Sequence, residues 1–407
     1  MRLDPRSSSF TLFLGVLAAL PPVATDMALP ALADIGASLQ ARAGLAGLTL
    51  SLFMAGFALS PFFYGPLSDR YGRRPVLLVG LLLFAVSGVA ATLAPNIGLL
   101  LAARLVQGMG AGVGMTLAMA MVRDLFHGRE AQARLTLITI VINTAPMLAP
   151  AVGAEVAGWL GWRGIYAAIA LWGLASLAAA WLWLGETATL PQGPQPPLLG
   201  AVLAGYRRVL GHGSIIAHVL LNACGFGWMF AYVAASPWLL IETLHVAPGL
   251  YAVLFACTGG GIVLGAMGGG RLVKAGVAPR KVLLAAVLLA LASTLVLQAL
   301  AASEHISVAR CMPLLVLATA AFGMTAPTAA AGALAPLPEL AGVAGGLLTS
   351  LQMLAGAAAS ALVAMLFPHL GVQAMSLTMA GFAIVGGLLV LWIWLGDTAK
   401  RAARQAA

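Results

Sequence analysis

The feature that most constrains this chain is a series of apolar segments, each about 20 residues long, separated by short polar stretches. A helix of about 20 apolar residues is long enough to cross the ~30 Å hydrocarbon core of a bilayer. A soluble fold does not fit, because only 8% of the 407 residues are charged, and soluble domains average about a quarter. We therefore interpret the segments as transmembrane helices.

Twelve such segments occur. Their residues do not alternate between polar and apolar, as they would in the strands of a membrane barrel, so an all-α membrane protein is predicted. We interpret the first segment as a span and not as a cleaved secretory leader, because its removal would leave eleven spans. The predicted spans cover residues 10–32, 45–64, 75–94, 97–122, 134–158, 163–184, 213–241, 248–270, 282–302, 311–334, 343–366 and 373–395.

One long, proline-rich connection divides the twelve spans into two sets of six. We predict an N-terminal six-helix bundle over residues 1–185, a cytoplasmic linker over 186–212 and a C-terminal six-helix bundle over 213–407. Within the linker, residues 198–210 are expected to form a short helix at the membrane surface. Two repeated bundles are typical of transporters that rock around a site near the bilayer midplane.

The basic residues predict the orientation, because cytoplasmic loops retain Lys and Arg. Placing both the N- and the C-terminus in the cytoplasm puts 17 of the 21 Lys and Arg residues there. The net charge of +9 is therefore a topology signal, and no nucleic-acid partner is expected. The four remaining basic residues are Arg42, Arg163 and Arg310 on the outside and Arg104 within a span.

A charged motif follows the second span and reads Gly65-Pro66-Leu67-Ser68-Asp69-Arg70-Tyr71-Gly72-Arg73-Arg74-Pro75. Its two glycines, Gly65 and Gly72, would permit a tight turn and a close helix approach. Asp69 is placed to lie against the positive N-terminal end of a neighbouring helix. One of the arginines is expected to pair with Asp124. The predicted conformational motif comprises Gly65, Asp69, Arg70, Gly72, Arg73, Arg74 and Asp124.

This motif resembles the loop between the second and third helices of the major facilitator superfamily, which carries G-x-L-x-D-R-x-G-R-R. Within that superfamily the chain is similar to the drug:proton antiporters of twelve spans, and most similar to the bicyclomycin and chloramphenicol resistance branch. Three further stretches carry the resemblance, namely Thr25–Pro30, Arg104–Gly110 and Gly161–Arg163. Two positions depart from the family pattern. Lys274 stands in the second half where the first half has Asp69, and Ala149–Ala154 replaces the Gly-Pro and Gly-Gly pairs of the fifth helix.

The resemblance implies a twelve-helix transporter of the bacterial inner membrane that exports small lipophilic or amphipathic compounds against proton entry by alternating access. It implies no enzymatic activity and no cofactor, with the proton gradient as energy source, and a monomer whose partners are its cargo, protons and the lipid bilayer. The same fold hosts exporters of endogenous metabolites or metallophores, which is the alternative function. A non-transporting sensor usually carries a soluble domain, and an intramembrane enzyme needs a nucleophile or a metal cluster; neither pattern is recognisable, nor is any metal site.

Charged residues inside spans are costly, by about 2.5–3.5 kcal/mol at a helix centre, and so mark candidate functional sites. Three qualify as proton- or substrate-coupling residues, namely Asp26, Arg104 and Glu155. Asp26 and Arg104 are expected at similar depths, where a direct or water-mediated pair is possible. Glu155 is either a second titrating site or a solvated carboxylate near the outer end of its helix.

For Asp26 we hypothesise a proton acceptor. Desolvation favours the neutral acid and a nearby cation favours the carboxylate, so protonation can respond to cargo. The alternatives are a permanent pair with Arg104 or a cap on the bend made by Pro21 and Pro22. Arg104 is either a coupling residue or a static counter-ion.

Neutral polar and aromatic residues near mid-span complete the predicted cargo cavity. The polar ones either face the cavity or bond a neighbouring helix, and the aromatic ones either line it or pack. An aromatic wall suits flat, lipophilic substrates and cations. The predicted cavity residues are Gln107, Asn143, Asn222, Phe226, Tyr232 and Gln352.

Overall fold

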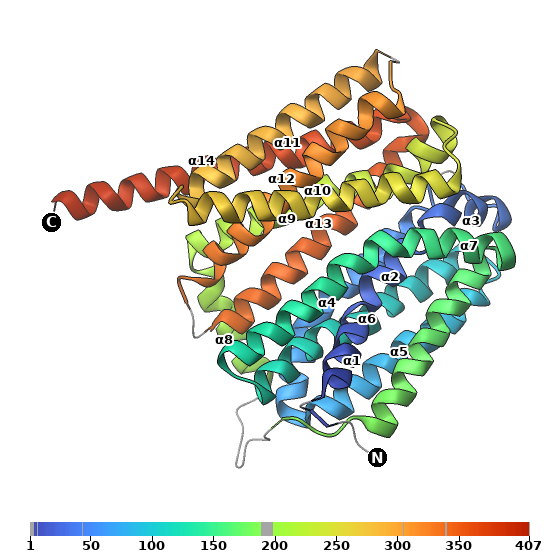
Figure 1. Ribbon diagram of the computed structural model, residues 1–407, viewed down its shortest axis with the longest axis horizontal. Coiled ribbons are helices and arrows are strands. Elements are labelled where there is room, and N and C mark those ends of the chain that lie inside the picture. Colours follow the sequence, from blue (N-terminus) through green and yellow to red (C-terminus); the bar gives the residue numbers. More distant parts are fainter. Residues whose placement is uncertain are drawn as a thin grey trace. The chain divides into compact units, whose positions relative to one another are not determined.

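The protein is described here by a computed structural model, which covers residues 4–5, 7–42, 44–188, 198–303, 305–337 and 340–406. Throughout these ranges the chain forms helices and connections, without a strand (Figure 1). The predicted all-α class is confirmed. Part of the predicted linker, residues 189–197, lies outside the described residues, as do Arg2 and Arg6.

The helices group into two compact units. The first unit contains Met1–Leu198 and Ala247–Ala252, and the second contains Leu199–Val246 and Val253–Ala407. The first unit is built from α1 (Ser8–Ala18), α2 (Leu20–Asp26), the 3₁₀ turn η1 (Leu29–Ala31), α3 (Leu32–Ser38), α4 (Leu48–Tyr71), α5 (Arg73–Thr92), α6 (Ile97–Leu125) and α7 (Gly128–Trp183). The second is built from α8 (Leu198–Leu210) without its first residue, α9 (Gly213–Pro237), the π-helical turn η2 (Trp238–Thr243), α10 (Pro248–Lys274) without its first five residues, α11 (Pro279–Ala302), α12 (Val308–Leu334), α13 (Ala341–Leu370) and α14 (Gln373–Ala406).

Over the described ranges, ten helices are long and apolar enough to cross a membrane. The bent pair formed by α1 and residues 20–38 would be an eleventh span. Helix α7 has 56 residues and is two helices that meet at Gly161, where φ of 68° and ψ of −176° interrupt the helical conformation. Counted as two, α7 brings the number of candidate spans to twelve. The side of the membrane on which the termini lie stays a prediction.

Prolines break the first span twice. A proline has no N–H, and its ring clashes with the carbonyl group four residues earlier. Pro21 and Pro22 lie just after the junction of α1 and α2, where the helix bends by 41°. Pro30 denies a donor to the Asp26 carbonyl, and α2 ends at Asp26 before the turn η1. Asp26 therefore lies at the end of a seven-residue helix between two breaks.

Helices α4 and α6 of the first unit cross in close backbone contact. A methyl group at Gly56 would overlap the carbonyl oxygen of Leu105, and one at Gly108 would overlap the carbonyl oxygen of Phe53. Small residues allow membrane helices to pack this closely. Gly56 and Gly108 are therefore packing residues of this crossing.

The second unit contains the same kind of crossing between α10 and α12. A methyl group at Gly265 would overlap the carbonyl oxygen of Ala320, and one at Gly323 would overlap that of Ile262. In each unit the second and fourth candidate spans are thus held together by a reciprocal pair of glycines. This correspondence supports the internal repeat expected from the sequence.

Helix α8 spans Leu198–Leu210, the bounds expected from the sequence. Its Val209 is buried in a cluster with residues of α9, α12 and α13. Arg207 and Arg208 are exposed on the same helix. One face of α8 is therefore covered by protein, and its position at a membrane surface stays a prediction.

Gly108→Ala tests the crossing of α4 and α6. The new methyl group must push the two backbones apart, so we expect a loss of roughly 1–3 kcal/mol in stability. The measurement is the thermal unfolding midpoint of the detergent-solubilised protein. Gly158→Ala is the matched control, because a methyl group there meets no atom within 4 Å. Equal midpoints for the two variants would contradict the assignment.

Candidate functional site

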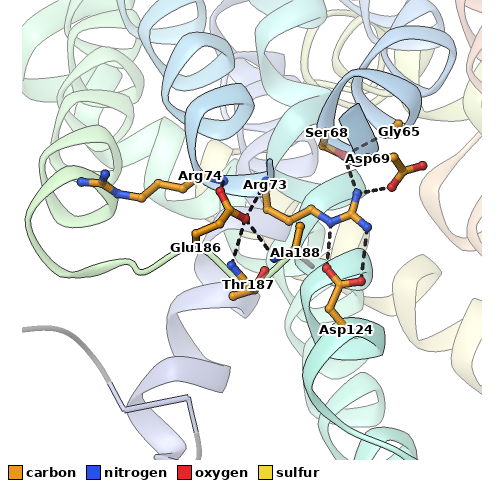
Figure 2. Close-up of polar contacts among 9 residues, drawn as sticks. All are labelled: Gly65, Ser68, Asp69, Arg73, Arg74, Asp124, Glu186, Thr187 and Ala188. Carbon is orange, nitrogen blue, oxygen red and sulfur yellow. Dashed lines mark hydrogen bonds and ion pairs between the residues drawn. The ribbon is translucent and has the colours of Figure 1, made fainter. Parts of the chain in front are cut away.

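Arg73, the first residue of α5, ties together three helix ends in the first unit (Figure 2). Its Nε donates to Asp124 Oδ2 at 2.8 Å and its Nη2 to Asp124 Oδ1 at 3.2 Å. Its Nη1 donates to Ser68 Oγ at 2.6 Å and to Asp69 Oδ1 at 2.5 Å. The predicted pairing of a motif arginine with Asp124 is confirmed. Such two-pronged contacts with a carboxylate fix geometry as well as charge.

The two carboxylates of this network differ in exposure. The side chain of Asp69 is 66% exposed and that of Asp124 is 21% exposed. Exposed ion pairs contribute little to stability because water screens them. The pair between Arg73 and Asp124 is therefore the stronger of the two contacts.

A residue that the sequence analysis did not select, Glu186, lies against the N-terminal end of α5. Its Oε1 accepts from the backbone N–H of Arg73 at 2.8 Å, and its Oε2 accepts from that of Arg74 at 3.1 Å. Oε1 also accepts from the N–H groups of Thr187 and Ala188, each at 2.9 Å (Figure 2). The first N–H groups of a helix have no partner inside the helix, and they favour negative charge. Glu186 therefore takes the position that the sequence analysis gave to Asp69.

The turn in the motif is made by one glycine and not by two. Gly72 has φ of 97°, and a side chain there would overlap Glu186. Gly65 lies inside α4, and a methyl group there would meet nothing within 4 Å. The expectation that Gly65 permits a turn or a close approach is wrong, because α4 continues through it to Tyr71 and stops at Gly72, which ends the helix as glycines commonly do.

The other motif arginines lie at the edge of this network. Arg74 donates from Nη2 to the carbonyl oxygen of Trp181 at 2.7 Å, at the end of α7. The Arg70 guanidinium lies 5.8 Å from the centre of the Tyr71 ring. Together with Glu186, Arg74 links the start of α5 to the end of α7.

Glu186 lies in a segment that is repeated near the C-terminus, and this repeat is a sequence signal for its role. Residues 181–188 read Trp-Leu-Trp-Leu-Gly-Glu-Thr-Ala, and residues 392–399 read Trp-Ile-Trp-Leu-Gly-Asp-Thr-Ala. In the second unit, Arg280 at the start of α11 lies over the Trp394 ring, 4.8 Å from its centre. Both units thus place an arginine at the start of one helix against this repeated segment.

Arg104 is buried in the first unit, with 0% of its surface exposed. Its Nη1 donates to Gln107 Oε1 at 2.6 Å, and its Nη2 donates to the carbonyl oxygen of Ala24 at 2.9 Å. The guanidinium lies 4.3 Å from the centre of the Phe53 ring and 5.5 Å from that of Tyr166. Aromatic faces attract a cation most strongly when water is excluded. Phe53 and Tyr166 were not selected from the sequence, because only the fold brings them to Arg104.

Asp26 is also buried, with 6% of its surface exposed. Within the described ranges it forms no ion pair within 4.0 Å, so the possible direct pair with Arg104 is not present. Arg104 binds instead to the backbone of the same short helix, two residues before Asp26. The broken helix exposes a carbonyl oxygen to the guanidinium, and this contact takes the place of the carboxylate.

In the described part of the chain, the predicted residues of the fifth span form no hydrogen bond or ion pair with this cluster. Glu155 and Asn143 on α7 are both exposed, and neither bonds another residue in the described part of the chain. A groove of about 610 Å³ lies between the first span and α7. Its lining includes Val23, three residues before Asp26, and Met27, the residue directly after it, and its walls are apolar apart from Thr144.

In the second unit the predicted polar residues bond each other. Asn222 Nδ2 on α9 donates to Gln352 Oε1 on α13 at 3.0 Å, so this pair bonds neighbouring helices. Phe226 packs on the rings of Phe230 and Phe322, with ring centres 5.4 and 5.7 Å away. Tyr232 is fully buried, and its hydroxyl lies 3.3 Å from Thr258 Oγ1. No group of three His, Cys, Asp or Glu side chains that could hold a metal occurs in the described ranges.

Glu186→Gln tests the cap on α5. The amide keeps the size of the side chain but loses its charge, so we expect a loss of about 1 kcal/mol in stability. The thermal unfolding midpoint checks this, with Glu130→Gln as the control. Glu130 is an exposed acid whose side chain, among the residues that the structure describes, bonds only Arg134, one turn along its own helix. If the cap does not stabilise the protein, Glu186→Gln will lower the unfolding midpoint no more than Glu130→Gln does.

The chain is 29% identical to the multidrug resistance protein D of Escherichia coli over 397 residues, which is 96% of each chain. It is 30% identical to a bicyclomycin resistance protein homolog of Haemophilus influenzae over 227 residues. That second match spans 56% of this chain and 57% of the relative.

A solved structure has the same fold. The crystal structure of a D-xylose-proton symporter matches with a TM-score of 0.74, covering 95% of this chain and 97% of the symporter chain. The two sequences are 17% identical, so this likeness concerns the fold alone. The family model of the Major Facilitator Superfamily matches residues 14–360. The chain therefore belongs to the Major Facilitator Superfamily and is a multi-pass membrane transporter.

Proposed function

We propose that this protein is a proton-coupled multidrug exporter that moves small lipophilic or amphipathic compounds out of the cell by alternating access. The observation that carries the proposal is Asp26, a buried acid without an ion-pair partner among the described residues, at the broken end of α2. A buried carboxyl group without an ion-pair partner can take and release a proton as its surroundings change. Proton entry would then drive cargo exit.

Two observations support the cargo class, namely the names of the relatives and the apolar groove of the first unit. The E. coli relative is a multidrug resistance protein and the H. influenzae relative is named for bicyclomycin resistance. The apolar groove beside Val23 and Met27 suits lipophilic molecules, because it offers few polar groups. We therefore favour drugs over the alternative cargo, an endogenous metabolite or a metallophore.

The proposal includes the organisation predicted from the sequence. The protein lies in the bacterial inner membrane, with both termini in the cytoplasm and the cargo path between bundles 1–185 and 213–407. It needs no cofactor beyond the proton gradient, catalyses no reaction on its cargo, binds no nucleic acid and works as a monomer. Arg104 and Glu155 belong to the coupling site, with Arg104 contacting the helix that carries Asp26.

Asp26→Asn tests the proton acceptor. The amide cannot lose or gain a proton, so the variant should fold and exchange cargo across the membrane but lose gradient-driven accumulation. The measurement is transport of a panel of lipophilic compounds in reconstituted vesicles under an imposed pH gradient. Asp34→Asn is the matched control, since Asp34 is an exposed acid of the same span in α3. Undiminished pumping by Asp26→Asn would refute the role of Asp26.

Asp69→Asn tests the conformational motif. Loss of one carboxylate from Arg73 leaves Asp124 in place, so we expect slower turnover with cargo binding intact. The maximum transport rate and the binding affinity of one transported compound are the two measurements. Weakened binding at an unchanged rate would count against a conformational role.

A further inference from the structure

A second apolar groove, of about 530 Å³, lies in the first unit between α5 and the C-terminal part of α7. One wall is formed by residues of α5 between positions 78 and 82, and the other by residues of α7 between positions 174 and 181. All the lining side chains are Leu, Val, Ala or Trp. Val79, Leu82 and Trp181 are at least half exposed, so the described part of the chain leaves the groove open.

The groove has the depth of part of one lipid leaflet. Helices α5 and α7 are both candidate spans, so the groove faces the hydrocarbon tails of the bilayer. Its lining on α7 runs from Leu174 to Trp181, which is about 10 Å along a helix. Half of the bilayer core is roughly 15 Å thick. The part of an acyl chain nearest the headgroup therefore matches the groove in length and in chemistry.

Arg74 lies at one end of this groove. It precedes the lining residue Leu78 by one turn of α5, and its Nη2 donates to the carbonyl oxygen of the lining residue Trp181 at 2.7 Å. Figure 2 shows the Arg74 side chain extending away from Glu186 and Asp124. The guanidinium therefore lies beside the groove and outside the ion-pair network of Arg73.

The charge of Arg74 is not balanced by a neighbouring side chain. Among the described residues its guanidinium has no ion-pair partner within 4.0 Å, whereas Arg73 has two. The Nε of Arg74 is buried and donates to no described residue. Glu186 accepts from the backbone N–H of Arg74, and its oxygens are engaged by N–H groups of the backbone. A half-buried cation attracts an anion more strongly than a fully solvated one does, because water screens it less.

We propose that the groove binds an anionic phospholipid, with one acyl chain between α5 and α7 and the headgroup phosphate on Arg74. The planar guanidinium can bond two phosphate oxygens at once. A headgroup that also carries an ammonium is disfavoured, because Glu186 is already engaged and offers that cation no free carboxylate. With the predicted orientation, the lipid belongs to the cytoplasmic leaflet.

This site is separate from the groove beside the first span. The two grooves share no lining residue, and the lipid site does not depend on the proposed export of drugs. A lipid bound there contacts the start of α5 and the end of α7, which Arg74 already joins. Because a ligand that binds only the folded state stabilises it, the lipid should also raise the thermal unfolding midpoint.

Native mass spectrometry of the full-length, detergent-solubilised protein with added dioleoylphosphatidylglycerol tests the headgroup contact. The measurement is the dissociation constant of the first bound lipid. Arg74→Gln removes the charge and the fork of donors, so binding should weaken roughly tenfold. Arg123→Gln is the matched control, because Arg123 is an exposed arginine in the last turn of α6, on the same predicted side of the membrane. Its loss should change the constant by less than about twofold.

Two further comparisons test the groove and the choice of headgroup. Ala178→Phe fills the groove, so it should weaken binding of the same lipid by about fivefold or more. Ala175→Phe is its control, since Ala175 is exposed on the same helix but does not line the groove. Dioleoylphosphatidylethanolamine should bind the wild type roughly tenfold more weakly than dioleoylphosphatidylglycerol, and Arg74→Gln should abolish this difference.

Equal affinities of Arg74→Gln and Arg123→Gln for dioleoylphosphatidylglycerol would overturn the proposal. Equal affinities of Ala178→Phe and Ala175→Phe would also overturn it, because the lipid would then lie elsewhere on the surface. Ala178→Phe removes no side-chain hydrogen bond, so it decides the question if Arg74→Gln does not fold. None of these measurements contains a transport step, so undiminished pumping by Asp26→Asn would refute the proposed function and leave the lipid site standing.

Discussion

A backbone polar group that loses its helical partner inside a bilayer has no water to replace it, and this constraint organises the first unit. Prolines at positions 21, 22 and 30 take donors away from the first span. The rest of the unit supplies substitutes, namely glycines where a carbonyl must come close and Arg104 where it must be bonded. The only buried acid of that span lies between the two breaks.

Unpaired backbone groups also shape the motif, at the helix ends that are predicted to be cytoplasmic. The start of α5 presents N–H groups that no helical carbonyl can reach, and Glu186 satisfies two of them. Gly72 is glycine because of that approach and because of its positive φ. The motif therefore combines an ion-pair network around Arg73 with a cap on the backbone of α5. The charged residues of the motif predict the network, but they do not predict the cap.

The fold could be predicted from the sequence because span length and hydropathy are local properties. Sequence analysis also identified Asp26, Arg104 and Asp124, since a charge inside a span or beside a basic loop is conspicuous wherever the chain folds. It missed Phe53 and Tyr166, which look like ordinary apolar residues until the fold places them at Arg104. It assigned the cap to Asp69 and not to Glu186, because contacts between residues 113 positions apart leave no local spacing.

The position of Glu186 in the chain has a mechanical consequence. It lies just after the last helix of the first unit and before the connection that leads to α8. Both of its carboxylate oxygens are engaged by the first turn of α5. A pull transmitted along the connection is therefore shared between the end of α7 and the start of α5, which Glu186 and Arg74 link to each other.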